Sequence, residues 1–431
     1  TVRYNGAVIF VKIVYKNFQP MTFNQNLSHV TYQYEISALT GTTAKDIKTI
    51  YDNYPNTRIV QNRHGIRVVV VQTGQLARGN IQAFLLTLTA SLTLLAISNT
   101  VVDSLVSSVI ESYPRLSHRY YALKAKWFKK KHLMYWDRNA PLPFQNTKTY
   151  SWSEARNTVI EAYSAFDKEI GKIVKKFFDE NWIHAPVLEG KSPGAFAAST
   201  VASVHPFILV NFQGKTRDVA TLAHELGHGV HQYLAGKNQS HFNASTPLTL
   251  AETASVFGEM LTFKLILNAS TSKKERKALL ANKVEDMLNT VIRQIAFFQF
   301  EKEVHTLRKN SELSTNEICE IWMNVQKDSL GPSIKYEDEY KYFWSYIPHF
   351  IHSPFYVYAY AFGDCLVNSL FNTYEQGLEN FENKYIDLLK SGGSKKYDEL
   401  FQPFNLDLSK KSFWKKGLSM IEKLIDELET L

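Results

Sequence analysis

The stretch VATLAHELGHGVHQY, residues 219–233, is the most informative in the sequence, because it places His-Glu-Leu-Gly-His at positions 224–228 inside a helical apolar pattern. Residues i and i+4 share one face of a helix, so His224 and His228 can reach the same metal ion. Neutral imidazole is a preferred ligand of Zn²⁺. Glu225 follows the first histidine and is the candidate general base, which would take a proton from a metal-activated water.

A second motif, LTLAETASVFGEMLTF at residues 248–263, contains a candidate for the third protein ligand that a catalytic zinc needs. That ligand is Glu252, near the start of a predicted helix. Glu259 lies further along the same face at i+7, where its carboxylate can accept the second ring N–H of a ligand histidine. We therefore predict one Zn²⁺ per chain. The alternative is two amphipathic helices that carry these side chains incidentally.

Longer stretches around these motifs resemble the oligoendopeptidase F branch of the thimet oligopeptidase family, from about residue 100 to the C-terminus. The similar stretches are YPRLSHRYYALKAKWF (113–128), YWDRNAPLPF (135–144), GKSPGAFAASTVASVHPFILVNFQGKTRDVATLAHELGHGVHQYLA (190–235), TPLTLAETASVFGEMLTF (246–263) and FWSYIPHFIHSPFYVYAYAFGD (343–364). The resemblance implies a mainly α, cleft-shaped zincin metalloendopeptidase with a small β-sheet, which hydrolyses oligopeptides. It assigns zinc to His224, His228 and Glu252, and the catalytic role to Glu225.

The stretch 343–364 is expected to contribute hydrogen-bond donors. In the family that it resembles, a histidine and tyrosines of this region stabilise the tetrahedral intermediate. Tyr O–H and His N–H groups suit the oxyanion that forms when water attacks an amide carbonyl. A packed aromatic helix is the alternative for some of these side chains. The candidates are His349, His352, Tyr356, Tyr358 and Tyr360.

Other parts of the C-terminal region show patterns of secondary structure only. Helices are predicted for residues 151–182, with Ser153 as N-cap, and for residues 273–308. A short strand is predicted at Phe207–Phe212. We expect an exposed edge of this strand to pair with the backbone of a bound peptide.

The first 102 residues differ from the rest. Residues 1–78 contain β-branched runs and are predicted to form strands. Residues 79–102 carry no charge and are long enough to cross a bilayer as one helix, which makes them a candidate transmembrane helix. Several Ser and Thr residues interrupt this segment, so a buried core helix is the alternative. We place the peptidase domain at residues 103–431.

Residues 55–103 also resemble the last ectodomain strand and second membrane helix of the ATP-gated purinergic cation channels. The ATP-contact residues of that family do not carry over. A second hypothesis is therefore a membrane receptor or channel fragment fused to an inactive peptidase-like domain. The intact His-Glu-Leu-Gly-His motif favours the enzyme. Members of the family that the C-terminal region resembles carry a helical lobe before the catalytic part, and we expect the channel-like segment to stand in its place here.

Charge and cysteine content bear on the partners and on the cellular compartment of the protein. The net charge of +8 is spread along the chain, so we expect no nucleic-acid partner. Cys319 and Cys365 show no metal or disulfide spacing, which suits a reducing compartment. The excess of Lys and Arg after residues 79–102 predicts a cytoplasmic catalytic domain, tethered to the membrane if that segment spans it. The chain begins with Thr1 and shows no signal peptide, which we interpret as a fragment or an incomplete gene model.

Overall fold

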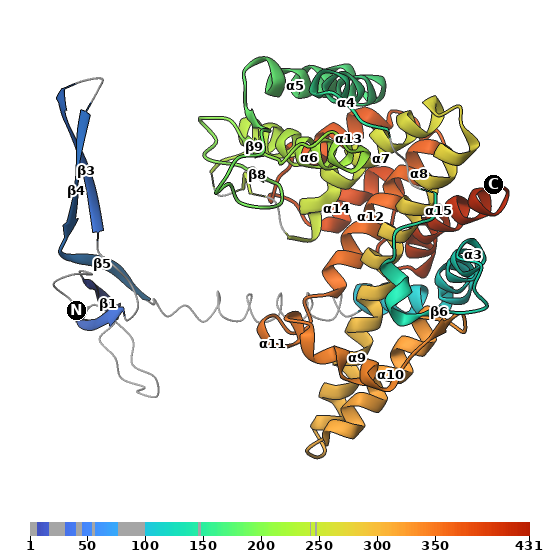
Figure 1. Ribbon diagram of the computed structural model, residues 1–431. Coiled ribbons are helices and arrows are strands. Elements are labelled where there is room, and N and C mark those ends of the chain that lie inside the picture. Colours follow the sequence, from blue (N-terminus) through green and yellow to red (C-terminus); the bar gives the residue numbers. More distant parts are fainter. Residues whose placement is uncertain are drawn as a thin grey trace. The chain divides into compact units, whose positions relative to one another are not determined.

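The computed structural model is mainly helical with small sheets, as the sequence predicts (Figure 1). The described residues are 7–16, 31–39, 45–53, 57–75, 100–144, 148–241, 243–245 and 248–431. The chain divides into two compact units, Thr1–Leu94 and Leu95–Leu431, each with its own internal contacts.

Strands form the described part of the first unit. β1 (Ala7–Lys16) pairs in antiparallel register with β2 (Thr31–Leu39) and in parallel register with β5 (Ile66–Gln75). β3 (Lys45–Asn53) and β4 (Thr57–His64) form a separate antiparallel pair. The β-branched runs of the sequence lie in β1 and β5, because their side chains suit a pleated surface.

The candidate transmembrane segment 79–102 lies almost entirely outside the described residues, since 76–99 are not among them. Its last three residues, 100–102, are described and lie in a helix that continues to residue 112. Among the helices that the structure describes, none is both long and apolar enough to cross a bilayer. The transmembrane prediction therefore gains no support.

Helices dominate the second unit and enclose one continuous apolar core. After the helix at 100–112 they are α3 (Arg119–Trp127), α4 (Trp152–Phe166), α5 (Lys168–Asp179), α6 (Thr216–Asn238), α7 (Leu248–Ala269), α8 (Lys273–Met287), α9 (Arg293–Arg308), α10 (Thr315–Leu330), α11 (His349–His352), α12 (Tyr358–Glu375), α13 (Phe381–Lys390), α14 (Tyr397–Phe401) and α15 (Lys411–Glu429). Two short strands, β6 (Leu133–Met134) and β10 (Ile334–Lys335), pair in parallel. The predicted helical stretch 273–308 is confirmed as α8 and α9, joined by a π-helical turn.

α6 and α7 pack closely because a glycine lets their backbones approach. Gly227 of α6 faces Ala254 of α7, and a Cβ at position 227 would come within 2.3 Å of the Ala254 carbonyl oxygen. Any larger residue would push the two helices apart. On α4, the buried Tyr163 donates a 2.7 Å hydrogen bond to the carbonyl oxygen of Ala223 and fixes α6 from a third helix.

Residues 151–182 form two helices rather than the single run that their periodicity suggests. Asp167 has an extended backbone, and its carboxylate accepts hydrogen bonds from the first N–H groups of α5. Aspartate is a strong N-cap, so a new helix begins after it. The N-cap of α4 is Ser151 and not the predicted Ser153, because the Ser151 hydroxyl accepts the hydrogen bond from the third residue of the helix.

The strand prediction at Phe207–Phe212 is partly wrong. The strand is β9 (Phe207–Leu209), and it is the central strand of a sheet ordered β7-β9-β8. β7 (Ile183–His184) pairs with it in parallel and β8 (Phe196–Ala198) in antiparallel register. Both edges of β9 are therefore occupied, and the outer positions of this sheet belong to β7 and β8.

Candidate metal and catalytic site

α6 and α7 bring the three predicted ligands together. His224 and His228 lie one turn apart on α6, and their ring centroids are 4.9 Å apart. Glu252 projects from α7, with its Oε2 3.3 Å from His224 Nε2 and 3.5 Å from His228 Nε2. One ligand atom from each residue lies within 4.8 Å of the others. Within the part of the chain that the structure describes, this is the one group of such side chains that could hold a metal ion.

The separations suit a zinc ion. In a tetrahedral site with metal–ligand distances of about 2.0–2.1 Å, neighbouring ligand atoms are about 3.3–3.4 Å apart. The two distances from Glu252 agree with this geometry. Two imidazoles and one carboxylate also form a known catalytic zinc set, which keeps the fourth position open. The residues present therefore fit Zn²⁺.

The charges around the cluster favour a cation. Burial raises the pKa of Glu252. The hydrogen bond from His224 and the charges of both histidines outweigh this effect and lower the pKa to about 2. Burial lowers the pKa of His224, but hydrogen bonds to Glu252 and Glu259 raise it to about 10. Two carboxylates thus surround His224, and they create the negative potential that a divalent cation would neutralise.

Glu259 connects His224 to a buried lysine. Its Oε2 is 3.3 Å from His224 Nδ1, the ring nitrogen that remains available to donate when Nε2 binds a metal. Its Oε1 accepts a 2.6 Å hydrogen bond from Lys283 Nζ, and the lysine side chain is only 8% exposed. Burial raises the pKa of Glu259, but Lys283 and His224 lower it to about 2. The ionised carboxylate can therefore orient the His224 ring.

Glu225 is buried beside the ligand cluster, with 7% of its surface exposed. Burial raises the pKa of its carboxyl group, the charge of His224 lowers it, and the charge of Glu252 raises it. The carboxylate therefore lies within electrostatic reach of two ligands. A carboxylate in such surroundings is a better proton acceptor than an exposed one.

Three of the five predicted His and Tyr candidates form one cluster. His349 Nε2 is 3.1 Å from the Tyr360 hydroxyl oxygen. The Tyr356 ring stacks near His349 with a centroid distance of 5.9 Å and meets Tyr360 edge-on at 5.5 Å. Tyr360 also lines the cavity that contains His224 and Glu252. This tyrosine is the member of the cluster that faces the metal ligands.

The other two candidates lie elsewhere. The Tyr358 ring packs edge-on against Phe298 of α9, with a centroid distance of 5.6 Å, and belongs to the margin of the core. His352 is exposed at the end of α11. The structure thus separates the three candidates that cluster at the cavity from the two that do not, a distinction that the sequence could not make.

Two charged residues beside the site, Lys283 and Asp364, were not predicted as site residues, although Asp364 ends the quoted stretch 343–364. Lys283 lies among apolar residues on the buried face of α8, and a lysine in such a position is the signal that could have found it. Asp364 lies one turn after Tyr360 on α12 and accepts a 2.8 Å hydrogen bond from Asn368. Burial raises its pKa to about 6, while the charge of Lys283 lowers it.

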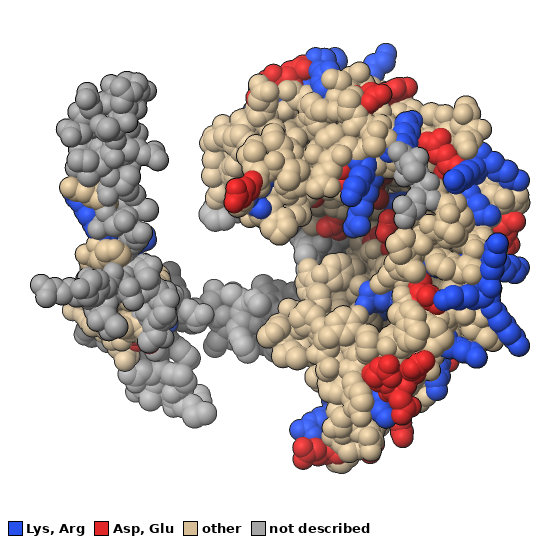
Figure 2. All heavy atoms as spheres, viewed as in Figure 1, with Lys and Arg blue, Asp and Glu red and all other residues tan. Residues whose placement is uncertain are grey.

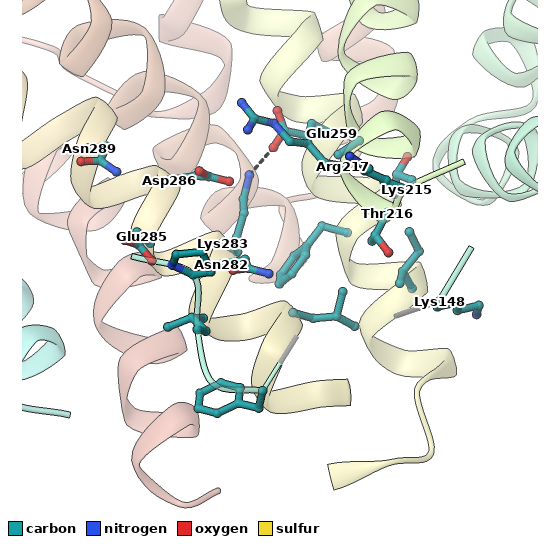
Figure 3. A pocket seen from close by; sticks show the side chains of 18 of the residues that line it. Lys148, Lys215, Thr216, Arg217, Glu259, Asn282, Lys283, Glu285, Asp286 and Asn289 are labelled. Carbon is teal, nitrogen blue, oxygen red and sulfur yellow. Dashed lines mark hydrogen bonds and ion pairs between the residues drawn. The ribbon is translucent and has the colours of Figure 1, made fainter. Parts of the chain in front are cut away.

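The ligand cluster opens into a cavity of about 480 Å³. A second cavity of about 740 Å³ continues from it, because Arg217, Glu259 and Lys283 line both. In Figure 3, Lys283 points from α8 toward Glu259, and Lys215 and Arg217 lie at the start of α6. Figure 2 shows basic and acidic side chains interspersed over the visible face of the second unit, with acidic side chains inside its hollow.

Residues 56–420 match the model of Peptidase family M3. Oligoendopeptidase F of Lactococcus lactis subsp. cremoris is 30% identical over 332 residues, which are 77% of this chain and 54% of the relative. Oligopeptidase PepF of Bacillus subtilis is 28% identical over 337 residues, 78% of this chain and 50% of the relative. The chain thus spans about half the length of the curated relatives that it matches. The resemblance of residues 55–103 to ATP-gated channels is not borne out, since the family match takes in this segment.

Solved structures agree with these matches. A crystal structure of a Chlamydophila abortus protein has a TM-score of 0.71 and 29% identity, over 77% of this chain and 55% of that one. Oligoendopeptidase F from Enterococcus faecium has the same fold, with a TM-score of 0.59 and 23% identity over 77% of this chain and 52% of that one. The family match covers most of the chain and includes the His224–His228 motif, α7 and the His349–Tyr360 region. This chain belongs to peptidase family M3.

Proposed function

We propose that this chain is a zinc-dependent metalloendopeptidase that hydrolyses peptide bonds of oligopeptides, with residues 103–431 as its catalytic domain. The observation that carries the proposal is the pair of distances from Glu252 to His224 and His228, at the edge length of a zinc tetrahedron, beside the buried Glu225. The family supports the same reaction class. The competing hypothesis, a channel fragment with an inactive domain, offers no reason for an intact ligand set.

Each residue of the site has a role in this proposal. His224, His228 and Glu252 would hold one Zn²⁺, which supplies a Lewis acid that polarises the carbonyl and lowers the pKa of water. Glu225 accepts a proton from the attacking water and later gives it to the leaving amine. Glu259 accepts the Nδ1–H of His224 and so fixes the tautomer of this ligand.

Tyr360 is the proposed donor to the oxyanion. It shares the cavity with His224 and Glu252, and a tyrosine hydroxyl can donate one hydrogen bond. If His349 carries its ring proton on Nε2, it donates to the Tyr360 oxygen and leaves the hydroxyl hydrogen for the substrate. Tyr356 packs against both rings and limits their movement.

The substrate class follows from the relatives and the cavity. The matched relatives are named oligoendopeptidases and oligopeptidases, and oligopeptides are the substrates that we propose here. Cavities of about 480 and 740 Å³ lie in the range of sites that enclose a small ligand. They suit a short stretch of extended chain better than a folded protein.

The test of the proposal is metal analysis combined with peptide cleavage by the full chain. We expect about one zinc per chain, cleavage of an internally quenched peptide, loss of cleavage with a chelator and recovery on adding zinc. His228→Ala should lose both the metal and the activity. A chain that retains no zinc, and that cleaves no peptide when zinc is added, would refute the assignment.

A further inference from the structure

The turn between α11 and α12 has a strained backbone. The carbonyl oxygen of Ser353 accepts a 3.2 Å hydrogen bond from the N–H of Tyr356, and Pro354 occupies the second position of this turn. In a type II β-turn the third residue has positive φ and is normally Gly or Asn. Here the third residue is Phe355, with a φ of 60°. A bulky residue rarely adopts this conformation, so neighbouring groups must hold it.

Glu301 of α9 binds the strained residue directly. Its Oε1 accepts a 2.9 Å hydrogen bond from the N–H of Phe355, a donor that the hydrogen bond of the turn does not use. Only 2% of Glu301 is exposed, and its Oε2 is buried and has no hydrogen-bond partner among the residues that the structure describes. A buried carboxylate with a single hydrogen bond destabilises the fold. A role in function explains its presence better than a role in stability.

One face of α9 holds the turn through both backbone and side chain. Phe298, Glu301 and His305 lie at i, i+3 and i+7, and so on the same face of the helix. The Phe355 ring packs between the two aromatic residues, with centroid distances of 6.2 Å to Phe298 and 4.8 Å to His305. Tyr358, just beyond the turn, packs on the same Phe298. The turn is therefore fixed on one side by α9.

We propose that Glu301 is a positioning residue: by binding the Phe355 N–H, it holds the strained turn in the conformation that brings Tyr356 against His349 and Tyr360. Positive φ at Phe355 lets its own ring face α9 while the next ring joins the cluster at the cavity. The inference rests on the proposed peptidase function, in which this cluster stabilises the oxyanion. Glu301 is not among the described residues that line the cavity, so it acts through the turn.

Two substitutions at this position separate the hydrogen bond from the packing. Glu301→Leu removes the acceptor, whereas Glu301→Gln retains an oxygen that can accept the same N–H. We expect the Leu variant to lower kcat about tenfold or more, since small misplacements of catalytic groups cost up to about 100-fold. KM should stay within about twofold and zinc content should not change. The Gln variant should retain kcat within about threefold of the wild type. Glu303→Leu, at an exposed position of the same helix, is the matched control.

A double-mutant cycle tests whether Glu301 affects kcat through the strained backbone of Phe355. Phe355→Asn introduces a residue that tolerates positive φ, so the turn needs less support from Glu301. The fold loss in kcat caused by Glu301→Leu should be at least about threefold smaller in the Phe355→Asn background than in the wild type. Equal losses in the two backgrounds would overturn the proposed link.

Amide hydrogen exchange at Phe355 supplies a readout that needs no activity. In the full chain, Glu301→Leu should raise the exchange rate of this amide about tenfold or more, and Glu301→Gln should not. An unchanged rate, or a faster rate with unchanged kcat, would overturn the proposal. If the Leu variant does not fold, Glu301→Ala takes its place with the same expected outcomes. A wild-type chain that binds zinc but cleaves no peptide would refute the peptidase function, and the positioning role with it, while exchange would still report whether Glu301 anchors the turn.

Discussion

Tyr358 and Tyr360 lie on the same helix, but their rings have different neighbours. Tyr360 faces the cavity and pairs with His349, whereas Tyr358 packs against Phe298. Tyr360→Phe removes only the hydroxyl group, so it should lower kcat about 10²–10³-fold if that hydroxyl is an oxyanion donor. KM should change little, because the ring remains.

Tyr358→Phe is the matched control for this prediction, since it removes the same atom from a ring that packs in the core margin. Its kcat should stay within about twofold of the wild type. Steady-state kinetics with one peptide substrate measures both variants. Equal effects at the two positions would exclude Tyr360 as the specific donor.

Glu225 offers a second test at the scale of one residue. Glu225→Gln preserves the shape of the buried side chain and removes its capacity to take a proton. General-base catalysis is worth roughly 10²–10⁴-fold, so kcat/KM should fall by that factor while zinc content stays at the wild-type value. A variant that retains zinc and cleaves at nearly the wild-type rate would assign the base elsewhere.

Among the helices, α8 contacts α7 through the ion pair between Lys283 and Glu259. Lys283→Met should weaken zinc binding by up to about 10–100-fold, the typical cost of losing the group that orients a metal ligand, because it removes the cation that holds Glu259 against His224. The buried Glu259 would also lose its cation and favour protonation, which removes the acceptor for His224 Nδ1. Competition with a chromogenic chelator measures the affinity.

Lys274→Met, an exposed position on the same helix, is the control for a general effect on α8. It should leave the zinc affinity within about twofold of the wild type. If Lys283→Met unfolds the chain, Lys283→Arg retains the charge and should keep most of the affinity. Wild-type affinity in a folded Lys283→Met variant would show that Glu259 holds His224 unaided.

The elements of the site differ in how far the sequence could predict them. Helical spacing determines which side chains share a face, so the pairing of His224 with His228 and of Glu252 with Glu259 was accessible from α6 and α7 alone. Local spacing can mark Lys283 as a lysine on an apolar helix face, but it contains no information on which distant helix this lysine contacts, so Lys283 was not assigned to the site. The position of β9 within its sheet likewise depends on strands that meet it only in the folded chain.

For the His and Tyr candidates, too, local spacing could not predict which side chains meet in the folded chain. From spacing alone, Tyr356, Tyr358 and Tyr360 could belong to one continuous helix or strand. In the structure α12 begins at Tyr358, so Tyr356 lies before the helix. Positive φ at Phe355, in the preceding turn, redirects the chain. Nothing in the spacing predicts a conformation that this residue type normally avoids.

At the scale of the whole second unit, the candidate site belongs to the same core as the rest of the helices. α12 carries Tyr360 and Asp364 at one end, is buried from Ala361 to Thr373, and packs against both α7 and α15. α6 and α7 meet at Gly227 without space between their backbones. A ligand that links α6 to α7 should therefore stabilise the unit as a whole and not only its cavity.

Removal of zinc should accordingly lower the Tm of the chain. A ligand that binds only the folded state stabilises it by about 2.7 kcal/mol when its concentration is 100-fold above Kd. For a domain of this size, that corresponds to a fall of roughly 5 °C on removal of the metal. Calorimetry of the full chain, dialysed against a chelator and then reloaded with zinc, measures the shift and its reversal. His228→Ala should unfold at the lower temperature whether or not the chelator is present, because it lacks one of the three ligands. An unchanged Tm in a wild-type sample shown to have lost its zinc would mean that the metal does not link α6 to α7.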